Sequence, residues 1–397
     1  MAFDYDVAII GAGASGSYAA TVFAKCSNKT VVLIDSNDRI GKKLSLTGNG
    51  QGNVSNEKVS ASSYFSLDSK EDLDRVASLV KEFSPSLLST VCLADERGRI
   101  YPGSKQASSI TDIFRKTIEG KVTLKLGNKV VRLSPGYNLQ LDSGEKISAE
   151  FVILACGGAA QPRLGSDGSG HDLAKALGHS VTKLYPSLVQ ITTETDKIRG
   201  LKGKRLEAEL SLIDDNDSNA PLARSSGEII FQDYGITGDA VFDLSPHLAG
   251  KKSATISINF LYPFRFDYGA VKKVLEERDL SLEDKREIFT GILPNQVGRK
   301  VVEECLNDYS VDKVIQKARS FDLKVTGSLG FDRAQVTRGG IRLNEVSDNL
   351  ESRLSKKLFI TGEMLDIDGP CGGYNLHWAF SSALTAAKAI INYGKNR

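Results

Sequence analysis

The stretch YDVAIIGAGASG at residues 5–16 decides the fold of the amino-terminal part of the chain. It opens with an apolar, β-rich run at 5–10 and continues with the pattern G-x-G-x-x-G. Small residues at 15–26 are typical of a helix, and 30–34 reads as a second strand. This order of strand, glycine turn, helix and strand predicts a βαβ unit whose helix start binds phosphate groups.

Each glycine of the pattern has a physical reason. Gly11 permits the tight turn, Gly13 lets the backbone approach a pyrophosphate, and Gly16 allows the helix to pack closely. Asp35 ends the second strand 19 residues after Gly16 and is placed to accept hydrogen bonds from ribose hydroxyls. These residues predict a dinucleotide site, but the pattern alone does not choose between NAD and FAD.

The composition is that of a soluble globular protein. Of the 397 residues, 41% are hydrophobic and 25% charged, and no apolar run approaches the roughly 18 residues that a membrane span needs. The length predicts two or three structural units. The start MAFDYDV is unlike a positively charged signal peptide, so we expect a cytoplasmic protein without membrane insertion.

Charge and metal-ligand residue types argue against several functions. A formal net charge of +2, with scattered Lys and Arg, argues against nucleic acid as a partner. The five cysteines include no CxxC pair and the four histidines show no ligand spacing, so we expect no disulfide framework and no metal. The sequence does not specify the oligomeric state.

The rest of the chain alternates between helical and strand patterns. A charged helical stretch is expected over 267–317, and short strands between Val122 and Ile147 are expected to form a small antiparallel layer. From about Ser187 the texture changes to that of an insert, β-rich first and helical second. Further helices are expected at 70–83, 106–118, 165–177 and 373–392, and further strands at 151–155, 205–213, 228–231, 254–260 and 358–361.

The segment GKKLSLTGNGQGNVSN at 41–56 indicates which dinucleotide is bound. It is too long and too rich in glycine and polar amides for a plain connection, so its N–H groups and amides are expected to meet a polar ligand. A flavin and its phosphates would suit them. A surface loop with no ligand is the alternative interpretation.

With this segment the sequence resembles the NAD(P)/FAD-dependent oxidoreductases of the BaiN/RdsA type, also called YhiN-like or aminoacetone-oxidase-like flavoproteins. The resemblance covers almost the whole chain and is weakest over 246–329. Its most specific motifs, in the order of the family, are GKKLSLTGNGQGNVSN (41–56), ERGRIYPGSKQAS (96–108), LACGGAAQPRLGSDGSGHDLAKALGH (154–179), FQDYGITGDAV (231–241) and GEMLDIDGPCGGYNLHWAFSSA (362–383).

The resemblance implies an α/β fold of the two-dinucleotide-binding flavoprotein type. A Rossmann-like FAD-binding domain would be interrupted by a β-barrel-like insert, which would itself carry a small helical domain. Combined with the change of texture, this predicts a discontinuous FAD-binding domain at 1–187 and 335–397, a β-rich insert at 188–265 and 320–334, and a helical insert at 266–319.

The resemblance also implies a set of cofactor-binding positions. Those near the pyrophosphate, ribose, adenine and flavin ring are Gly11, Gly13, Ala14, Gly16, Asp35, Lys42, Lys43, Thr47, Gly48, Asn49, Gly50, Asn53, Val130, Ala155, Gly157, Gly158, Gly362, Glu363, Asp368, Gly369, Gly372, Gly373, Tyr374, Asn375 and Leu376. Val130 would hold the adenine through its backbone, and the positions from Gly362 onward would close over the isoalloxazine.

The carboxy-terminal helix start at Gly372–Asn375 suits a flavin because its N–H groups and dipole stabilise negative charge near N1 and O2 of the ring. The catalytic residues stay unassigned. His377 is a candidate proton donor or a packing residue, and Tyr234 is a candidate proton donor or part of a hairpin turn. Cys371 is interpreted as a small hydrophobe rather than a reactive thiol.

The 41–56 segment departs from the family at one place. Relatives usually read G-R-C-N there, whereas this chain has Gln51 and Gly52 in place of the Arg and Cys. A contact of that Arg with an anionic substrate would be lost, so substrate or flavin potential can differ. Arg97, Arg99 and Tyr101 would serve an anionic substrate or form a solvated face.

The resulting functional hypothesis is an FAD-dependent oxidoreductase. NAD(P)H, as a transient co-substrate without a second G-x-G-x-x-G motif, would reduce FAD, whose N5 passes hydride to a small organic substrate between the flavin domain and the insert. The alternatives are a redox-sensing or regulatory flavoprotein with little turnover, and a flavin-dependent RNA-modifying enzyme. The sequence specifies neither the substrate nor the choice between NADH and NADPH.

Overall fold

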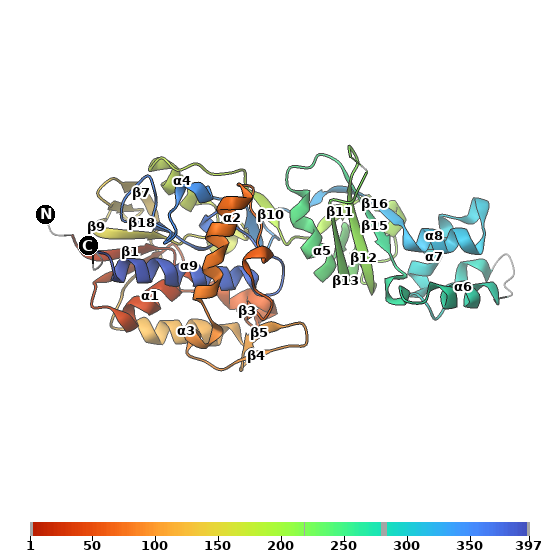
Figure 1. Cartoon of the computed structure of the whole chain (residues 1–397), viewed down its shortest axis with the longest axis horizontal. Coiled ribbons are helices and arrows are strands. Elements are labelled where there is room, and N and C mark those ends of the chain that lie inside the picture. Colours follow the sequence, from red (N-terminus) through yellow and green to blue (C-terminus); the bar gives the residue numbers. More distant parts are fainter. Residues whose placement is uncertain (1–2, 218, 279–283, 395–397) are drawn as a thin grey trace. The chain divides into compact units, whose positions relative to one another are not determined.

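The computed structural model describes residues 3–217, 219–278 and 284–394 and divides the chain into two compact units (Figure 1). Unit 1 combines Met1–Tyr185 with Gln335–Arg397, and unit 2 is Pro186–Ala334. In the described ranges we find no helix that combines the length and the apolar character required to cross a bilayer.

Unit 1 is built on a sheet with a parallel core. Its strands lie in the order β6-β2-β1-β9, and β18 pairs with the free side of β9. All three strands are parallel, but β2 is added on one side of β1 and β9 on the other. The strand order therefore reverses at β1, which creates a switch point at the carboxyl ends of the strands. The bounds are β1 Tyr5–Ile10, β2 Val31–Asp35, β6 Thr123–Leu126, β9 Lys146–Leu154 and β18 Leu358–Ile360.

Alternate residues of the strands face opposite sides of this sheet, as the period of two requires. Val7 and Ile9 belong to one buried cluster, together with residues of helices α1 (Ala14–Cys26), α3 (Ala107–Ile118) and α9 (Tyr374–Ile391). In Figure 1, α1 and α9 run next to each other along the sheet. This packing brings the carboxy-terminal helix against the first helix of the chain.

The opposite face of the sheet carries smaller elements. Ala8 and Ile10 pack in a second cluster with β7 and β8, which pair antiparallel with each other and with the first half of β9. A three-stranded sheet, β3-β5-β4, completes the unit, and β10 and β17 form a separate two-stranded pair. The bounds are β3 Ser55–Asn56, β4 Cys92–Ala94, β5 Arg99–Pro102, β7 Val130–Ser134, β8 Asn138–Leu141, β10 Tyr185–Ser187, β17 Val336–Arg338, α2 Lys70–Ala77 and α4 Ser169–Ala176.

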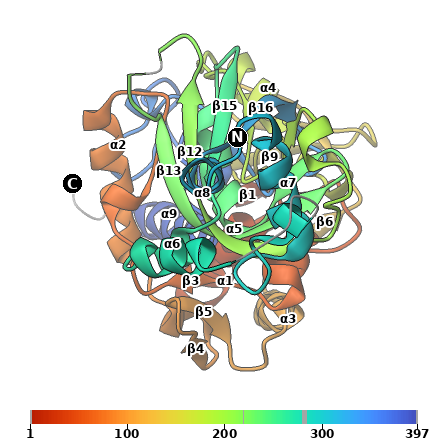
Figure 2. The same ribbon diagram turned by 90° about the vertical axis from the view of Figure 1, so that its right-hand side faces the viewer.

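Unit 2 is a closed antiparallel barrel with the strand order β11-β14-β13-β12-β15-β16. Figure 2, the same ribbon turned by 90° about the vertical axis, shows the long strands β12 and β13 lying alongside each other. Inward residues alternate with polar outward ones, as in Ala254–Asn259. The bounds are β11 Ile191–Thr193, β12 Arg205–Asp214, β13 Ala223–Gln232, β14 Gly235–Thr237, β15 Ala254–Asn259 and β16 Phe321–Ser328.

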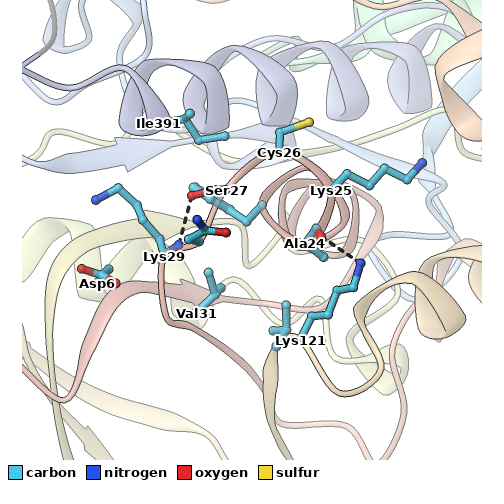
Figure 3. Close-up of a pocket in the computed structure, with 12 residues that line it drawn as sticks. Asp6, Ala24, Lys25, Cys26, Ser27, Lys29, Val31, Lys121 and Ile391 are labelled. Carbon is cyan, nitrogen blue, oxygen red and sulfur yellow. Dashed lines mark hydrogen bonds between the residues drawn. The ribbon is translucent and has the colours of Figure 1, made fainter.

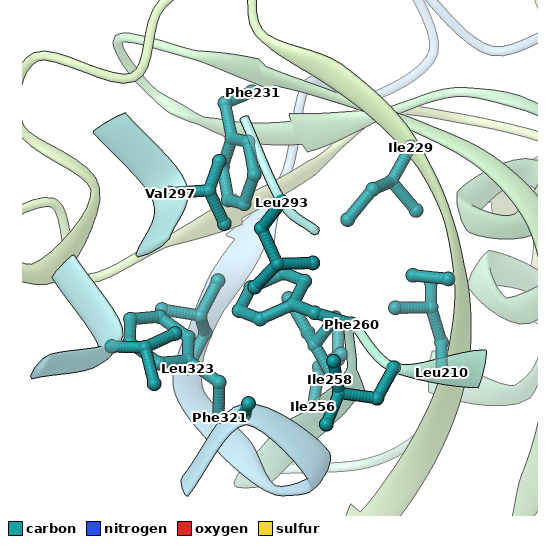
Figure 4. Packing of buried hydrophobic residues seen from close by; sticks show 14 of the residues in the cluster. Leu210, Ile229, Phe231, Ile256, Ile258, Phe260, Leu293, Val297, Phe321 and Leu323 are labelled. Atoms are coloured by element: carbon teal, nitrogen blue, oxygen red, sulfur yellow. The ribbon is translucent and has the colours of Figure 1, made fainter. Parts of the chain in front are cut away.

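The barrel shares its hydrophobic core with the helices of unit 2. Leu293 and Val297 belong to the same buried cluster as barrel residues Phe231 and Leu323 and as Phe260, which follows β15 (Figure 4). One continuous cluster therefore includes both parts, and their division into two domains stays a prediction. The helices are α5 Asp239–Leu244, α6 Tyr268–Glu276, α7 Asn295–Glu303 and α8 Val311–Arg319, and residues 279–283 of the predicted helical stretch lie outside the described ranges.

The predicted fold class is confirmed. The amino-terminal βαβ unit, the insert with its barrel and the terminal helix are all present. One expectation was wrong: 123–126 does not belong to the antiparallel layer. It pairs parallel with β2 at the edge of the main sheet, because an edge strand takes up the free N–H and C=O groups of β2.

Truncating Leu293 tests the shared core of unit 2. Leu293 is 5% exposed in the cluster that joins helices and barrel, so Leu293→Ala is expected to lower the free energy of unfolding by about 2–5 kcal/mol. Leu306→Ala is the control, because Leu306 is 44% exposed and its loss is expected to cost within about 0.5 kcal/mol. Denaturant unfolding measures both, and equal effects would contradict a shared core.

Candidate functional site

The carboxyl edge of the parallel sheet collects the predicted binding segments. Gly11 follows β1, Asp35 ends β2, Ala155 follows β9 and Thr361 follows β18. Backbone hydrogen bonds hold these strand ends in register, because Gly11 N donates to Ile34 O at 2.8 Å and Thr361 N donates to Leu154 O at 3.0 Å. Four segments separated in sequence thus meet at the switch point, where open α/β sheets bind ligands.

Two glycines of the first turn are required by packing within the protein. Gly11 has a φ of +101°, and a Cβ there would lie 2.4 Å from Ala155 O. A Cβ on Gly16 would lie 1.8 Å from Gly11 O. Both distances are far below van der Waals contact, so no side chain fits at either position.

Gly13 is different. It has an ordinary φ of −72°, and a Cβ there would meet no atom within 4 Å. Packing within the described residues therefore does not require a glycine here. The position caps α1 and faces its unpaired N–H groups, so an approaching phosphate explains it. This open cradle fits the pyrophosphate of a dinucleotide.

Asp35 is fixed beside the turn by its neighbours. One carboxylate oxygen accepts from Ala12 N at 2.5 Å and the other from Asn37 N at 2.7 Å. Asn37 Nδ2 also donates to the second oxygen at 2.9 Å. A carboxylate has about four acceptor sites, so one is left for a ribose hydroxyl. The predicted ribose contact of Asp35 therefore suits the geometry but stays a prediction. Val130 is the first residue of β7 and pairs with Leu141, and its predicted adenine contact also stays a prediction.

The 41–56 segment folds into an irregular turn that no regular helix describes. Gly48 and Asn49 adopt left-handed conformations with φ of 58° and 54°, and Gly48–Gln51 are exposed. Lys43, at the start of this turn, forms an ion pair with Glu363 at 3.3 Å. The segment thus offers exposed polar groups beside the cradle, and its predicted FAD contacts at Lys42, Lys43, Thr47, Gly48, Asn49, Gly50 and Asn53 stay predictions.

The departure from the family at residues 51–52 has a structural counterpart. A Cβ on Gly52 would lie 2.8 Å from the Cα of Ala107, the first residue of α3. A cysteine would therefore require α3 or the loop to move. Gln51 is exposed, so its replacement of the family Arg removes a charge from the surface of this loop without a packing cost.

The start of α9 forms the opposite wall. Gly373 caps the helix with a φ of 98°, and a Cβ there would lie 2.2 Å from Ser55 O. The side chain of Asn375 accepts from Gly369 N at 2.9 Å and donates to Gly369 O at 2.8 Å, which pins the preceding turn. The predicted helix start is confirmed, and its first-turn N–H groups and dipole can stabilise negative charge.

The two candidate proton donors lie in different units. His377 is buried with both ring nitrogens engaged, Nδ1 at 2.7 Å from Ser55 Oγ and Nε2 at 2.8 Å from Val80 O. Burial lowers the pKa of His377, so the ring is neutral at pH 7. These contacts favour a structural role. Tyr234 lies in the β13–β14 hairpin of unit 2, and its catalytic role stays a prediction.

Arg99 and Tyr101 extend from β5 toward the Gly372 turn. A Cβ on Gly372 would lie 3.5 Å from Arg99 Nε. Burial raises the pKa of the Tyr101 phenol, while the nearby Arg99 charge acts to lower it. The exposed Arg97 lies in the adjoining turn, where its N–H donates to Asp95 at 2.9 Å. Binding of an anionic substrate by these residues stays a prediction.

Sequence reasoning missed several residues that organise this site. Thr337 contacts Glu363, and Arg338 forms a buried ion pair with Asp368 at 3.0 Å. Trp378 was not missed: the sequence offers it as a packing residue or one that faces the ring, and its Nε1 donates to Gly362 O at 3.0 Å. The paired glycines that follow Thr337 and Arg338 in the sequence were the one available signal, since glycine pairs mark close backbone approach.

A cavity of about 950 Å³ lies away from this edge (Figure 3). Its lining includes Asp6 and Val31, from the amino ends of β1 and β2, together with Lys25, Lys29 and Lys121. Lys121 Nζ donates to Ala24 O at 3.2 Å. The cavity is thus at the opposite end of the strands from the cradle, and it is not the dinucleotide site.

The sheet order, the open glycine cradle and the α9 cap define a protein of the dinucleotide-binding class. Residues 5–389 match the model of the family described as HI0933-like protein Rossmann domain. The chain therefore belongs to the HI0933-like family of flavin-dependent oxidoreductases, and the predicted family is confirmed.

Three curated relatives cover nearly the whole chain. A 3-dehydro-bile acid delta(4,6)-reductase of Clostridium scindens is 33% identical over 96% of this chain and 98% of its own length. A ribosomal RNA dihydrouridine synthase of Escherichia coli is 25% identical over 98% of both chains. The Haemophilus influenzae protein of the same name is 25% identical over 96% of this chain and 97% of its own.

Substitution of Gly13 and of Gly16 distinguishes a glycine needed for ligand binding from a glycine needed for packing within the protein. Gly13→Ala is expected to leave the melting temperature of the apoprotein within about 2 °C, because its Cβ meets no protein atom. It is expected to raise the Kd for FAD at least about tenfold. Gly16→Ala is expected to destabilise the apoprotein by about 3 kcal/mol or more. Calorimetry and flavin titration measure these effects, and unchanged FAD binding by Gly13→Ala would contradict the cradle.

Asp366 carries a buried carboxylate close to the cap. One of its oxygens accepts from Leu67 N and Thr182 Oγ1, both at 3.1 Å, and the other has no hydrogen-bond partner among the described residues. Burial raises the pKa of Asp366 from 3.8 to about 6, and the charges of Asp68 and Asp368 add to this. The protonated form of Asp366 is therefore favoured more in the folded protein than in the unfolded chain.

Asp366→Asn is expected to change stability with pH. The stabilising protonated form is fully present below about pH 4 and is lost as pH rises through 6, which removes up to about 3 kcal/mol. The variant cannot ionise, so its melting temperature relative to the wild type is expected to rise between pH 4 and pH 7. Calorimetry at each pH tests this, and parallel curves for the two proteins would refute it.

Proposed function

We propose that this protein is an FAD-dependent reductase of a carbon–carbon double bond conjugated to a carbonyl, acting on a small organic molecule with NAD(P)H as reductant. The observation that carries the proposal is the open cradle at Gly13. It lies at the carboxyl edge of the parallel sheet, as does the start of α9. The 33% identity to a bile acid reductase over nearly the whole chain supports the reaction class.

When bound, FAD supplies hydride chemistry through its N5 atom. The residues of this chain supply binding and electrostatics. The start of α1 would hold the pyrophosphate, Asp35 would hold the ribose, and the α9 dipole would stabilise negative charge at the ring. Glu363, held by Lys43 at 3.3 Å and by Thr337 N at 2.7 Å, is a fixed acceptor for a cofactor hydroxyl.

The reaction balances as a two-electron reduction. NAD(P)H loses a hydride, the β carbon of the substrate gains a hydride, and the α carbon takes a proton. Tyr234 is the proposed proton donor. Burial raises the pKa of its phenol, although Arg333 acts to lower it, so the proton stays on the oxygen at neutral pH.

A second candidate is reduction of uridine in RNA. Two relatives are named as ribosomal RNA dihydrouridine synthases, and uridine also has a double bond conjugated to a carbonyl. The higher identity to the bile acid reductase, 33% against 25%, favours the small molecule.

A redox-sensing role with little turnover is the third candidate function. The proposed location is the cytoplasm, where the five free cysteines would stay reduced.

Reoxidation of the reduced protein distinguishes these functions. The purified protein is reduced anaerobically by light and, separately, by NADH or NADPH, and is then mixed with a steroid enone, uridine-containing ribosomal RNA, a quinone or dioxygen. We expect the enone to restore the oxidised flavin spectrum at least about tenfold faster than the RNA, with a saturated ketone as the matched inactive control.

Each other outcome has a defined meaning. Faster reoxidation by RNA, with dihydrouridine formed, would establish the second candidate. Slow reoxidation by every acceptor would support sensing. A colourless protein that takes up no FAD would refute the proposal altogether. Tyr234→Phe is expected to lower kcat for the enone about 100-fold without changing the rate of flavin reduction, and an unchanged kcat would exclude Tyr234.

A further inference from the structure

Thr337 occupies the strand by which the chain re-enters unit 1. Unit 1 resumes at Gln335, and β17 begins at the next residue. Thr337 is 1% exposed. It lies far in sequence from the G-x-G-x-x-G turn and from the 41–56 segment, so no local pattern connects it with the cofactor.

The hydroxyl of Thr337 holds the loop that follows β9. Thr337 Oγ1 accepts from Ala159 N at 2.8 Å and from Ala160 N at 3.1 Å. Ala160 is itself fully buried, so this backbone has no access to water as an alternative partner. One side-chain oxygen therefore satisfies two consecutive N–H groups, which fixes the direction in which the loop leaves the sheet.

The backbone of Thr337 holds the other side of the site. Its N–H donates to Glu363 Oε1 at 2.7 Å, while Glu363 Oε2 pairs with Lys43 at 3.3 Å. The contacts continue from Ala159 through Thr337 and Glu363 to Lys43. They connect four segments that are far apart in sequence and that converge on the candidate FAD site.

Gly158 packs tightly against both Thr337 and Glu363. A Cβ on Gly158 would lie 2.3 Å from Thr337 Oγ1 and 2.7 Å from Glu363 Oε1. The backbone of Gly158 is thus pressed directly against both groups. A shift of the Thr337 side chain has to be followed by the Gly158 loop or by the Glu363 carboxylate.

We propose that Thr337 is a positioning residue of the FAD site, which sets the placement of the Gly158 loop and of Glu363 toward the cofactor. The inference rests on FAD binding and not on the proposed substrate. Loss of the hydroxyl leaves two N–H groups without their acceptor, which is costly in a buried site. The loop then relaxes toward other partners, and the surface that receives FAD changes.

The test compares three variants, all loaded with FAD after the apoprotein is prepared. Thr337→Val keeps the shape and removes the hydroxyl, whereas Thr337→Ser keeps the hydroxyl. Thr21→Val is the matched control, because Thr21 is 2% exposed and its hydroxyl donates only to Ser17 O within α1. The measurements are the FAD Kd, the flavin absorption spectrum, the melting temperature of apoprotein and holoprotein, and amide exchange at Ala159 and Ala160.

For Thr337→Val we expect a Kd for FAD raised at least about tenfold, an altered flavin spectrum, and faster amide exchange at Ala159 and Ala160. For Thr337→Ser we expect a Kd within about threefold of the wild type and protected amides. Thr21→Val is expected to keep the wild-type Kd and spectrum even if its melting temperature falls.

Two results would overturn the inference. One is a Thr337→Val protein with a lower melting temperature but the Kd and spectrum of the wild type, which would make Thr337 a structural residue only. The other is a Thr337→Ser protein as impaired as Thr337→Val. If Thr337→Val does not fold, Thr337→Ser is compared with Thr21→Val. A Thr337→Ser protein whose Kd for FAD is raised, or whose Ala159 and Ala160 amides lose protection, would overturn the inference, because its side chain keeps the hydroxyl. Absence of FAD binding by the wild type would instead refute the proposed function.

Discussion

The structure depends on a close approach of backbone to backbone at the switch point of the parallel sheet. A Cβ on Gly16 would lie 1.8 Å from Gly11 O, and one on Gly11 would lie 2.4 Å from Ala155 O. The first turn of α1 can reach the sheet only because these positions carry hydrogen in place of a side chain. This contact aims the unpaired N–H groups of α1 at the open space beside Gly13.

The other walls of the site follow from that placement. The start of α9, which packs on α1, is also fixed by Gly373, whose backbone lies against Ser55 of β3. The buried ring of Tyr18 on α1 contacts Phe380 of α9, with centroids 5.3 Å apart. Removing the close approach at Gly16 would therefore move the cap as well as the cradle, since one helix carries both constraints.

Local chemistry explains which parts could be predicted. The cradle, Asp35 and the start of α9 were predictable because glycine spacing, strand period and helix start act over a few residues. Thr337 was not, because its function arises from contacts with Ala159 and Glu363, which belong to other strand ends. The hydrogen bonds of both His377 ring nitrogens could not be predicted either, because their partners Ser55 and Val80 lie about 300 residues earlier.

The same distinction explains why the fold transfers between relatives more securely than the substrate. The constraints at Gly11, Gly16 and Gly373 concern the cofactor edge and the packing of helices, and they hold whatever molecule is reduced. Gln51 is exposed, and Gly52 is limited by Ala107 rather than by the cradle. Substitution of Gln51 can thus alter the surface charge of this loop without disturbing the packing at Gly11 and Gly16. A family whose members are named for a bile acid and for ribosomal RNA is consistent with this separation, because a common hydride chemistry needs only the cofactor edge to be preserved.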